Sequence, residues 1–267
     1  MGPLPIASPH PYGGGVRRGN LAGKNTKIIR IFANPLPNLN FIPMLQLVSR
    51  IPDNNKIKNI IFDFGGVICD LDIKRTEKKF REFGQAAYEG KFTPEEQSRE
   101  FASLVESYEK GHITSQEFRD TIKNHYLKTL TDQDVDDTWN ALLLGIPEKR
   151  IRLLEEIRSV YRIFLLSNSN EIHYLHYVEM FRQISGYNDF NDLFEKSYFS
   201  YQLHLSKPGR EIFEFVLRDS HLRAEETLFI DDTLKHVEMA RRLSLHAYHL
   251  QIQQRESITD LFESAHE

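Results

Sequence analysis

The sequence has almost no cysteine and no long apolar run. Its only cysteine, Cys69, excludes an intramolecular disulfide and a cysteine-rich zinc site. Such usage fits a reducing compartment, and we expect a cytoplasmic location. No run approaches the roughly 18 apolar residues of a membrane-spanning helix. The formal net charge of −4 gives no sign of a nucleic-acid or membrane-surface partner.

Acidic residues are absent from the first 52 positions, which hold six basic residues and eight of the eleven prolines. The remainder carries 28 basic and 38 acidic residues, a net charge of −10. We therefore expect residues 1–55 to form a disordered, basic, Pro- and Gly-rich extension. We interpret it as a tail, a cloning remnant or an upstream-extended start with Met44 as the alternative initiation site. A targeting role and an ordered extension are the alternatives.

From residue 57 onwards, apolar β-branched runs alternate with helical patterns. The runs typical of buried parallel strands are 57–62, 161–168, 226–232 and 246–250, with 197–200 as a further candidate. The helical patterns between them are 147–159, 207–220 and 234–245. This alternation predicts the α/β class with a doubly wound parallel sheet.

Residues 73–145 interrupt the alternation because they show helical signals and no convincing strand. Thr93, Thr114 and Thr131 are each suited to begin a helix as its N-cap. Aromatic residues at helical spacing are expected to form the core of this segment: Phe80, Phe83, Tyr108, Phe118, Tyr126 and Trp139. The sequence thus predicts a helical domain at 73–145, inserted into a core domain made of residues 56–72 and 146–267.

Polar residues stand at the carboxyl ends of the predicted strands, where open α/β sheets bind ligands. They are Asp63, Ser167, Asn168, Asp231 and Asp232, with Lys207 at the start of the intervening helix. Neighbouring carboxylates repel one another unless a cation holds them, and all-oxygen ligation suits Mg²⁺. A lysine and a Ser-Asn loop beside such a metal favour a phosphoryl group as ligand. Attack of one carboxylate on phosphorus, giving an aspartyl phosphate, is the chemistry that suits this set.

The same residues resemble the motifs of the haloacid dehalogenase (HAD) superfamily. In family order, the similar segments are FDFGGV at 62–67, LLSNSN at 165–170, SKPGREIF at 206–213 and LFIDD at 228–232. The resemblance covers about residues 57–255 and implies a Rossmann-like core with an inserted all-helical cap domain. The sequence is most similar to the bacterial phosphatases whose first motif reads DxGxV, including α-glucose-1-phosphate phosphatases.

The resemblance implies a magnesium site and a nucleophile. Asp63 would be the nucleophile and a Mg²⁺ ligand, and the backbone carbonyl of Gly65 a second ligand. Asp232 would be the third protein ligand, with Asp231 beside it in the inner or outer coordination sphere.

The resemblance also implies a phosphoryl site. Ser167 and the backbone of Asn168 would hold the phosphoryl oxygens, and Lys207 would bridge the nucleophile and the phosphoryl group. His173 and His176 could face the cap and touch substrate, although such residues are more often half-exposed helix histidines.

One departure from the family pattern concerns the general acid and base. Most phosphatases of this superfamily carry a second Asp two residues after the nucleophile, where this chain has Gly65. General acid–base catalysis contributes about 10²–10⁴-fold to a rate. We expect either a substrate with a good leaving group, such as an anomeric sugar oxygen, or a substitute acid, for which Asp70 and Asp72 are the nearest candidates. Asp72 is also suited simply to cap the following helix.

These inferences favour a Mg²⁺-dependent phosphomonoester hydrolase acting on a small phosphorylated metabolite, with a sugar phosphate favoured. The alternatives are a non-catalytic HAD-like binding protein and a haloacid dehalogenase. The missing second Asp supports the binding protein, whereas paired acids at Asp231 and Asp232 disfavour a carboxylate substrate without metal. Partners other than a small phosphate ester are not expected, and the oligomeric state is left open.

Overall fold

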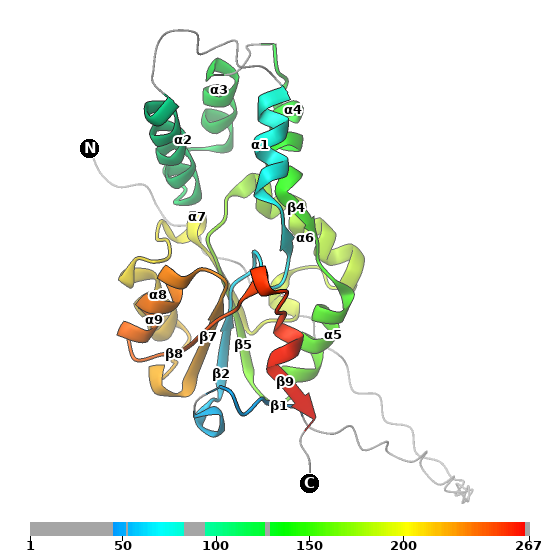
Figure 1. The fold of residues 1–267 in the computed structure, drawn as a ribbon, viewed down its shortest axis with the longest axis vertical. Helices are drawn as coiled ribbons and strands as arrows, with labels where there is room; N and C mark the ends of the chain where they lie inside the picture. The colour runs from blue at the N-terminus through cyan, green and yellow to red at the C-terminus, as the bar shows by residue number, and fades with distance from the viewer. Residues whose placement is uncertain (1–44, 52, 83–93, 126–128, 265–267) are drawn as a thin grey trace, which may run out of the picture. The chain divides into compact units, whose positions relative to one another are not determined.

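The core of the protein is a five-stranded parallel sheet in the order β6-β5-β2-β7-β8, seen edge-on in Figure 1. The computed structural model describes residues 45–51, 53–82, 94–125 and 129–264. The strands are β2 (Asn59–Phe62), β5 (Arg162–Ser167), β6 (Lys196–Phe199), β7 (Thr227–Asp231) and β8 (His246–His249). All five predicted strands are thus confirmed, and the central strand β2 pairs with β5 and β7.

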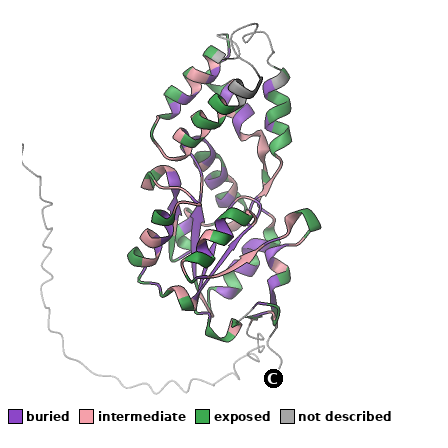
Figure 2. Cartoon of the chain, turned by 60° about the vertical axis from the view of Figure 1, so that its left-hand side comes forward, coloured by how far each residue is buried: buried purple, intermediate pink, exposed green. Residues whose placement is uncertain are grey.

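Helices cover both faces of this sheet (Figure 1). The helices of the core are α5 (Glu148–Ile157), α6 (Glu171–Ser185), α7 (Ser200–Leu203), α8 (Arg210–Asp219) and α9 (Leu234–Arg242). Ile60 and Phe62 of β2 belong to the apolar cluster with α5 and α6, whereas Ile61 belongs to the cluster with α8 and α9. Because strands alternate their side chains, a strand buried on both faces has a continuous apolar sequence. Figure 2 shows the buried sheet between partly exposed helices.

Between β2 and α5, the described residues form four α-helices. They are α1 (Ile73–Glu82), α2 (Pro94–Glu109), α3 (Ser115–His125) and α4 (Asp132–Trp139). The backbone N–H of Glu117 donates to Thr114 Oγ1 at 3.2 Å, and that of Asp134 donates to Thr131 Oγ1 at 3.1 Å. These two predicted caps are confirmed, whereas Thr93 lies outside the described residues.

The aromatic residues expected inside this helical segment form a cluster of their own. Phe80, Tyr108, Phe118 and Trp139 are buried together. Trp139 lies with its ring centroid 5.0 Å from that of Phe118, and Tyr108 stacks on Phe118 at 4.4 Å. The prediction is confirmed for these four, and Phe83 and Tyr126 lie outside the described residues.

The expectation of no strand within residues 73–145 is wrong. The strand β4 (Leu143–Gly145) pairs antiparallel with β3 (Asp70–Leu71). The segment that leads into helices α1–α4 and the segment that leads out of them are therefore hydrogen-bonded to each other. The apolar residues before Gly145 suggested the end of a helix, but α4 ends at Trp139. A pairing of two or three residues between distant segments leaves no periodicity in the sequence.

The expected boundary of the N-terminal extension is also wrong. The strand β1 (Leu45–Leu47) pairs antiparallel with β9 (Phe262–Ser264), and Leu47 and Ile51 are only 1% and 2% exposed. The folded part therefore includes residues that the sequence assigned to the extension at 1–55. Residues 1–44 lie outside the described part. None of the helices in the described ranges is long and apolar enough to cross a membrane.

Candidate active site

Lys207 joins two carboxylates from neighbouring strands at the carboxyl edge of the sheet. Its ammonium donates to Asp63 Oδ1 and to Asp231 Oδ2, both at 2.7 Å. Asp63 follows β2 directly, Asp231 ends β7, and Lys207 precedes α8. All three residues are buried. The parallel sheet thus brings together residues that are far apart in the sequence, as we expected from the strand ends.

The charges of this cluster do not balance. Burial of Asp63 raises its pKa to about 7, although Lys207 acts in the opposite direction. Burial alone would lower the pKa of Lys207, but the Asp231 and Asp63 carboxylates outweigh it and raise that pKa. Burial also opposes the ionisation of Asp231, but Lys207 and His236 hold its pKa below the usual range. One ammonium therefore faces an excess of carboxylate, which a bound cation would relieve.

The carboxylates of Asp63, Asp231 and Asp232 offer oxygen atoms that lie within 4.8 Å of one another. Asp231 already accepts hydrogen bonds from the Thr233 backbone N–H at 2.7 Å, from His236 Nδ1 and from Lys207.

The Asp232 carboxylate, in contrast, has no strong side-chain hydrogen bond among the described residues, since Thr233 Oγ1 lies 3.3 Å away. The backbone carbonyl of Gly65 accepts no hydrogen bond from the described residues. These free oxygens, together with Asp63, fit a hard divalent cation such as Mg²⁺.

The loop after β2 lets Asp232 approach the backbone closely. The carbonyl oxygen of Phe64 accepts from the N–H groups of Ile68 and Cys69 at 2.8 and 2.9 Å, which closes a tight turn. Gly66 lies in this turn with φ +76°, and a Cβ there would collide with the carboxylate of Asp232. Glycine is therefore required at Gly66 both for its conformation and for the space it leaves. The Gly-Gly pair in the sequence was the available signal for this position.

The segment LLSNSN at 165–170 supplies a hydroxyl group, from Ser167, and a side chain that clamps the backbone of Lys207, from Asn168. Ser167 ends β5 and is 2% exposed. Among the described residues, its hydroxyl has only a 3.3 Å contact with the carbonyl oxygen of Asn168. The side chain of Asn168 donates to the Lys207 carbonyl at 2.8 Å and accepts from the Lys207 N–H at 2.9 Å. The sequence indicated the backbone of Asn168 as a ligand but did not reveal this side-chain contact with Lys207.

Neither candidate substitute for the missing second Asp is free. Asp70 forms an ion pair with the buried Arg150 at 2.7 Å. Asp72 accepts a hydrogen bond from the backbone N–H of Lys74 at 3.1 Å in the first turn of α1, which is the capping role. At Gly65 itself, a Cβ would lie 2.7 Å from Leu71 Cδ1, so the leucine fills the space that an aspartate would use.

The two histidines of α6 have different environments. His173 is buried, stacks on Trp139 at 4.9 Å between ring centroids, and contacts Asn170 through Nδ1 at 3.0 Å. Burial lowers its pKa to about 4. His173 therefore packs at the junction of α4 and α6, whereas His176 is exposed on the surface of α6. Neither residue lines the cavity beside Lys207.

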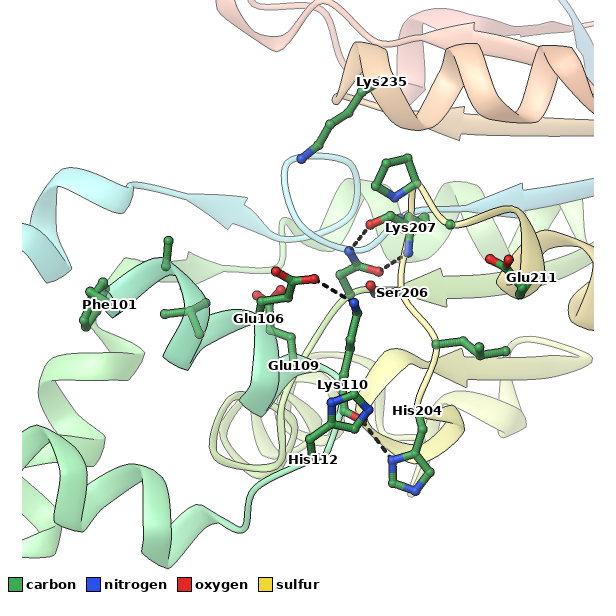
Figure 3. Close-up of a pocket in the computed structure, with 16 residues that line it drawn as sticks. Phe101, Glu106, Glu109, Lys110, His112, His204, Ser206, Lys207, Glu211 and Lys235 are labelled. Carbon is green, nitrogen blue, oxygen red and sulfur yellow. Dashed lines mark hydrogen bonds and ion pairs between the residues drawn. The ribbon is translucent and has the colours of Figure 1, made fainter. Parts of the chain in front are cut away.

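A cavity of about 790 Å³ adjoins Lys207 and Asn168. It lies between the end of α2 and the loop that carries Lys207 (Figure 3). The acidic residues Glu106 and Glu109 of α2 line it, as does Lys235 from the first turn of α9. Sequence reasoning missed these residues because charged positions on a helix usually face solvent. It also missed His236, for which no signal was visible.

The chain is similar to known hydrolases. A family model of haloacid dehalogenase-like hydrolases matches residues 57–243. A D-ribitol-5-phosphate phosphatase from Bacteroides thetaiotaomicron is 31% identical over 192 residues, which cover 72% of this chain and 91% of that protein.

Solved structures show the same likeness. A HAD family enzyme from Bacteroides thetaiotaomicron has a TM-score of 0.66 and 34% identity, covering 73% of this chain and 94% of that one. Its wild-type complex with magnesium and inorganic phosphate has a TM-score of 0.64 and 35% identity, with the same coverage. A HAD-like family hydrolase from Porphyromonas gingivalis has a TM-score of 0.62 and 34% identity, covering 72% of this chain and 90% of that one.

Proposed function

Since this chain belongs to the haloacid dehalogenase-like hydrolases, we propose that it is a phosphatase that hydrolyses a small phosphorylated metabolite through a phosphorylated Asp63. The observation that carries the proposal is the bridge of Lys207 between Asp63 and Asp231, beside the free carboxylate of Asp232. A sugar or sugar-alcohol phosphate is the favoured substrate, in line with the D-ribitol-5-phosphate phosphatase that is similar to this chain.

Asp63 acts as the nucleophile. Lys207 holds Oδ1, which leaves Oδ2 to attack phosphorus while the bond from phosphorus to the ester oxygen breaks. The leaving alkoxide keeps the bonding electron pair and takes a proton from solvent. Water then attacks the phosphorus of the aspartyl phosphate, releases inorganic phosphate and restores the Asp63 carboxylate. Lys207 offsets the negative charge that gathers on the phosphoryl oxygens.

The residues that would hold Mg²⁺ are Asp63, Asp232 and the carbonyl of Gly65. Bound there, the cation would neutralise phosphoryl charge and align the phosphate with the nucleophile. Asp231 orients Lys207 in this account, because both of its oxygens already accept hydrogen bonds. Ser167, whose hydroxyl has no strong partner in the described part of the chain, donates to a phosphoryl oxygen together with the backbone of Asn168.

Helices α1 to α4 serve as the cap domain over this site. Their segment, 73–145, stays the proposed cap, and the proposed core is 146–267 with a first part that begins near Leu45 instead of residue 56. A cap that covers the cavity beside Lys207 would exclude bulk water and bulky substrates, which favours small metabolites.

A non-catalytic binding protein is the second candidate, favoured by Gly65 and by the structural pairing of Asp70 and Asp72. Phosphate release separates the two functions. We expect release from a panel of sugar phosphates to require Mg²⁺ and to vanish with chelator or in Asp63→Asn. Binding of Mg²⁺ and inorganic phosphate without release from any ester would instead establish the binding protein. A haloacid dehalogenase is disfavoured because three clustered carboxylates would repel a carboxylate substrate.

A further inference from the structure

The cavity beside Lys207 has one charged wall formed by the end of α2 (Figure 3). Glu106 and Lys110 on this wall form an ion pair at 2.6 Å, so the charge of each side chain is compensated by the other. The next acidic residue, Glu109, also lines the cavity. Its carboxylate has no hydrogen bond and no ion pair with any described residue.

Glu109 is half-buried, and this burial raises the pKa of its carboxyl, while Lys235 and Lys207 act in the opposite direction. A carboxylate has about four sites for accepting hydrogen bonds, and leaving them unused away from bulk water is costly. The group therefore has unused capacity to accept hydrogen bonds from a molecule in the cavity.

Hydrogen bonds fix the position of Glu109 relative to the segment 165–170, which carries Ser167 and Asn168. The hydroxyl of Ser200 donates to the Glu109 carbonyl at 2.5 Å and accepts from the backbone N–H of Ser169 at 2.9 Å. The hydroxyl of Tyr108 accepts from the backbone N–H of Ile172 at 3.1 Å. The end of α2 is thus tied to the residues that follow Asn168, which sets the distance between Glu109 and the phosphoryl site.

We propose that Glu109 is a specificity residue that accepts hydrogen bonds from hydroxyl groups of a phosphorylated sugar or polyol. This inference rests on the proposed phosphatase function and names the group that recognises the part of the substrate beyond the phosphate. Neutral donors fit best, because Lys235 repels a cationic substrate group and Glu109 itself repels an anionic one.

Two esters of equal carbon number isolate the hydroxyl contacts. D-ribitol 5-phosphate and n-pentyl phosphate share a primary phosphate ester and differ in the hydroxyl groups. The quantity measured is the ratio of their kcat/KM values in Mg²⁺, for the wild type, Glu109→Ala and Glu109→Gln. The control is Glu100→Ala, which changes an exposed residue of the same helix that does not line the cavity.

We expect the wild type to favour D-ribitol 5-phosphate and Glu109→Ala to lower this preference by about tenfold or more, since hydrogen bonds to charged groups are among the strongest. Glu109→Gln keeps an uncharged acceptor and should fall between the two. An unchanged ratio in Glu109→Ala, or a wild type without preference for D-ribitol 5-phosphate, overturns the role of Glu109. Either result leaves the proposed phosphatase function standing. Absence of turnover of every ester, p-nitrophenyl phosphate included, overturns the proposed phosphatase and this inference with it.

Discussion

Asn168 holds both backbone polar groups of Lys207 with a single side-chain amide. Its Nδ2 donates to the Lys207 carbonyl at 2.8 Å, and its Oδ1 accepts from the Lys207 N–H at 2.9 Å. The ammonium of Lys207 in turn reaches Asp63 and Asp231. The side chain after β5 therefore positions the lysine that joins β2 and β7.

Asn168→Ala removes both contacts and leaves an N–H and a carbonyl of Lys207 without their partner. We expect the free energy of unfolding to fall by about 1–3 kcal/mol, because polar groups away from water are left unpaired. We also expect kcat to fall more than KM rises, because Lys207 loses its alignment. Denaturant titration and steady-state kinetics measure the two effects. Asn188→Ala, at an exposed asparagine, is the control, and kinetics equal to that control would contradict the clamp.

Alanine substitutions at two glycines with nearly the same φ separate the cost of backbone strain from the cost of a steric clash with Asp232. Gly66 has φ +76° with Asp232 where a Cβ would lie, whereas Gly186 has φ +75° with nothing within 4 Å. We expect Gly186→Ala to lose only the roughly 1–2 kcal/mol of a left-handed non-glycine residue and to keep its activity. Gly66→Ala should lose Mg²⁺ affinity and phosphate release as well, because Asp232 must move. Calorimetric Mg²⁺ titration of both variants is the measurement, and equal affinities would contradict the expectation.

Without a general acid at Gly65, catalysis should depend strongly on the leaving group. We expect sugar 1-phosphates to be hydrolysed faster than 5- or 6-phosphates in kcat, since a protonating acid contributes about 10²–10⁴-fold. Rates on such a panel test this, and faster hydrolysis of the primary esters would contradict it.

A double substitution could place a general acid at position 65. Gly65→Asp alone would place its Cβ 2.7 Å from Leu71 Cδ1, so the second substitution Leu71→Ala makes room for it. We expect the double variant to show a smaller difference between 1- and 6-phosphates than Leu71→Ala alone. An unchanged difference would indicate that Gly65 does not limit the reaction.

His173 should make stability depend on pH below neutrality. Burial lowers its pKa from 6.5 to about 4, so between these values the unfolded chain binds a proton that the folded chain does not. The contribution to stability is complete above pH 6.5 and is lost as the pH falls toward 4, by roughly 3 kcal/mol at most.

Urea unfolding at several pH values measures this slope. We expect His173→Gln to show a shallower loss of stability between these pH values than the wild type. Leu175→Gln, at an exposed and non-titrating position of α6, should keep the wild-type slope. A His173→Gln profile that parallels the wild type would contradict the assignment.

The strands β2, β5 and β7 could be predicted because each is a short apolar run that ends at, or is followed directly by, a polar residue. Asp63, Ser167 and Asp231 were predicted as site candidates for the same reason, since parallel strands bring their carboxyl ends to one edge. The predictions depended on local pattern and on the rule for strand ends. The sheet brings Asp63 and Asp231 to this edge, where both contact Lys207.

The features that could not be predicted depend on contacts between distant segments. The pairing of Leu45–Leu47 with Phe262–Ser264 involves three residues on each strand, too few to produce a periodic signal. The Asn168 clamp and the free carboxylate of Glu109 depend on side-chain directions that only the packed helices determine. Leu71 occupies the space beside Gly65, and nothing in its own neighbourhood of the sequence indicates this.

A phosphorylated Asp63 can be trapped chemically during turnover. The enzyme would be quenched during turnover of its best phosphate ester in Mg²⁺, reduced with borohydride to convert an aspartyl phosphate to homoserine, digested and examined by mass spectrometry. We predict homoserine at position 63 in the wild type, and its absence without Mg²⁺ or in Asp63→Asn. Rapid turnover with an unmodified Asp63, or modification of a different carboxylate, would contradict the account.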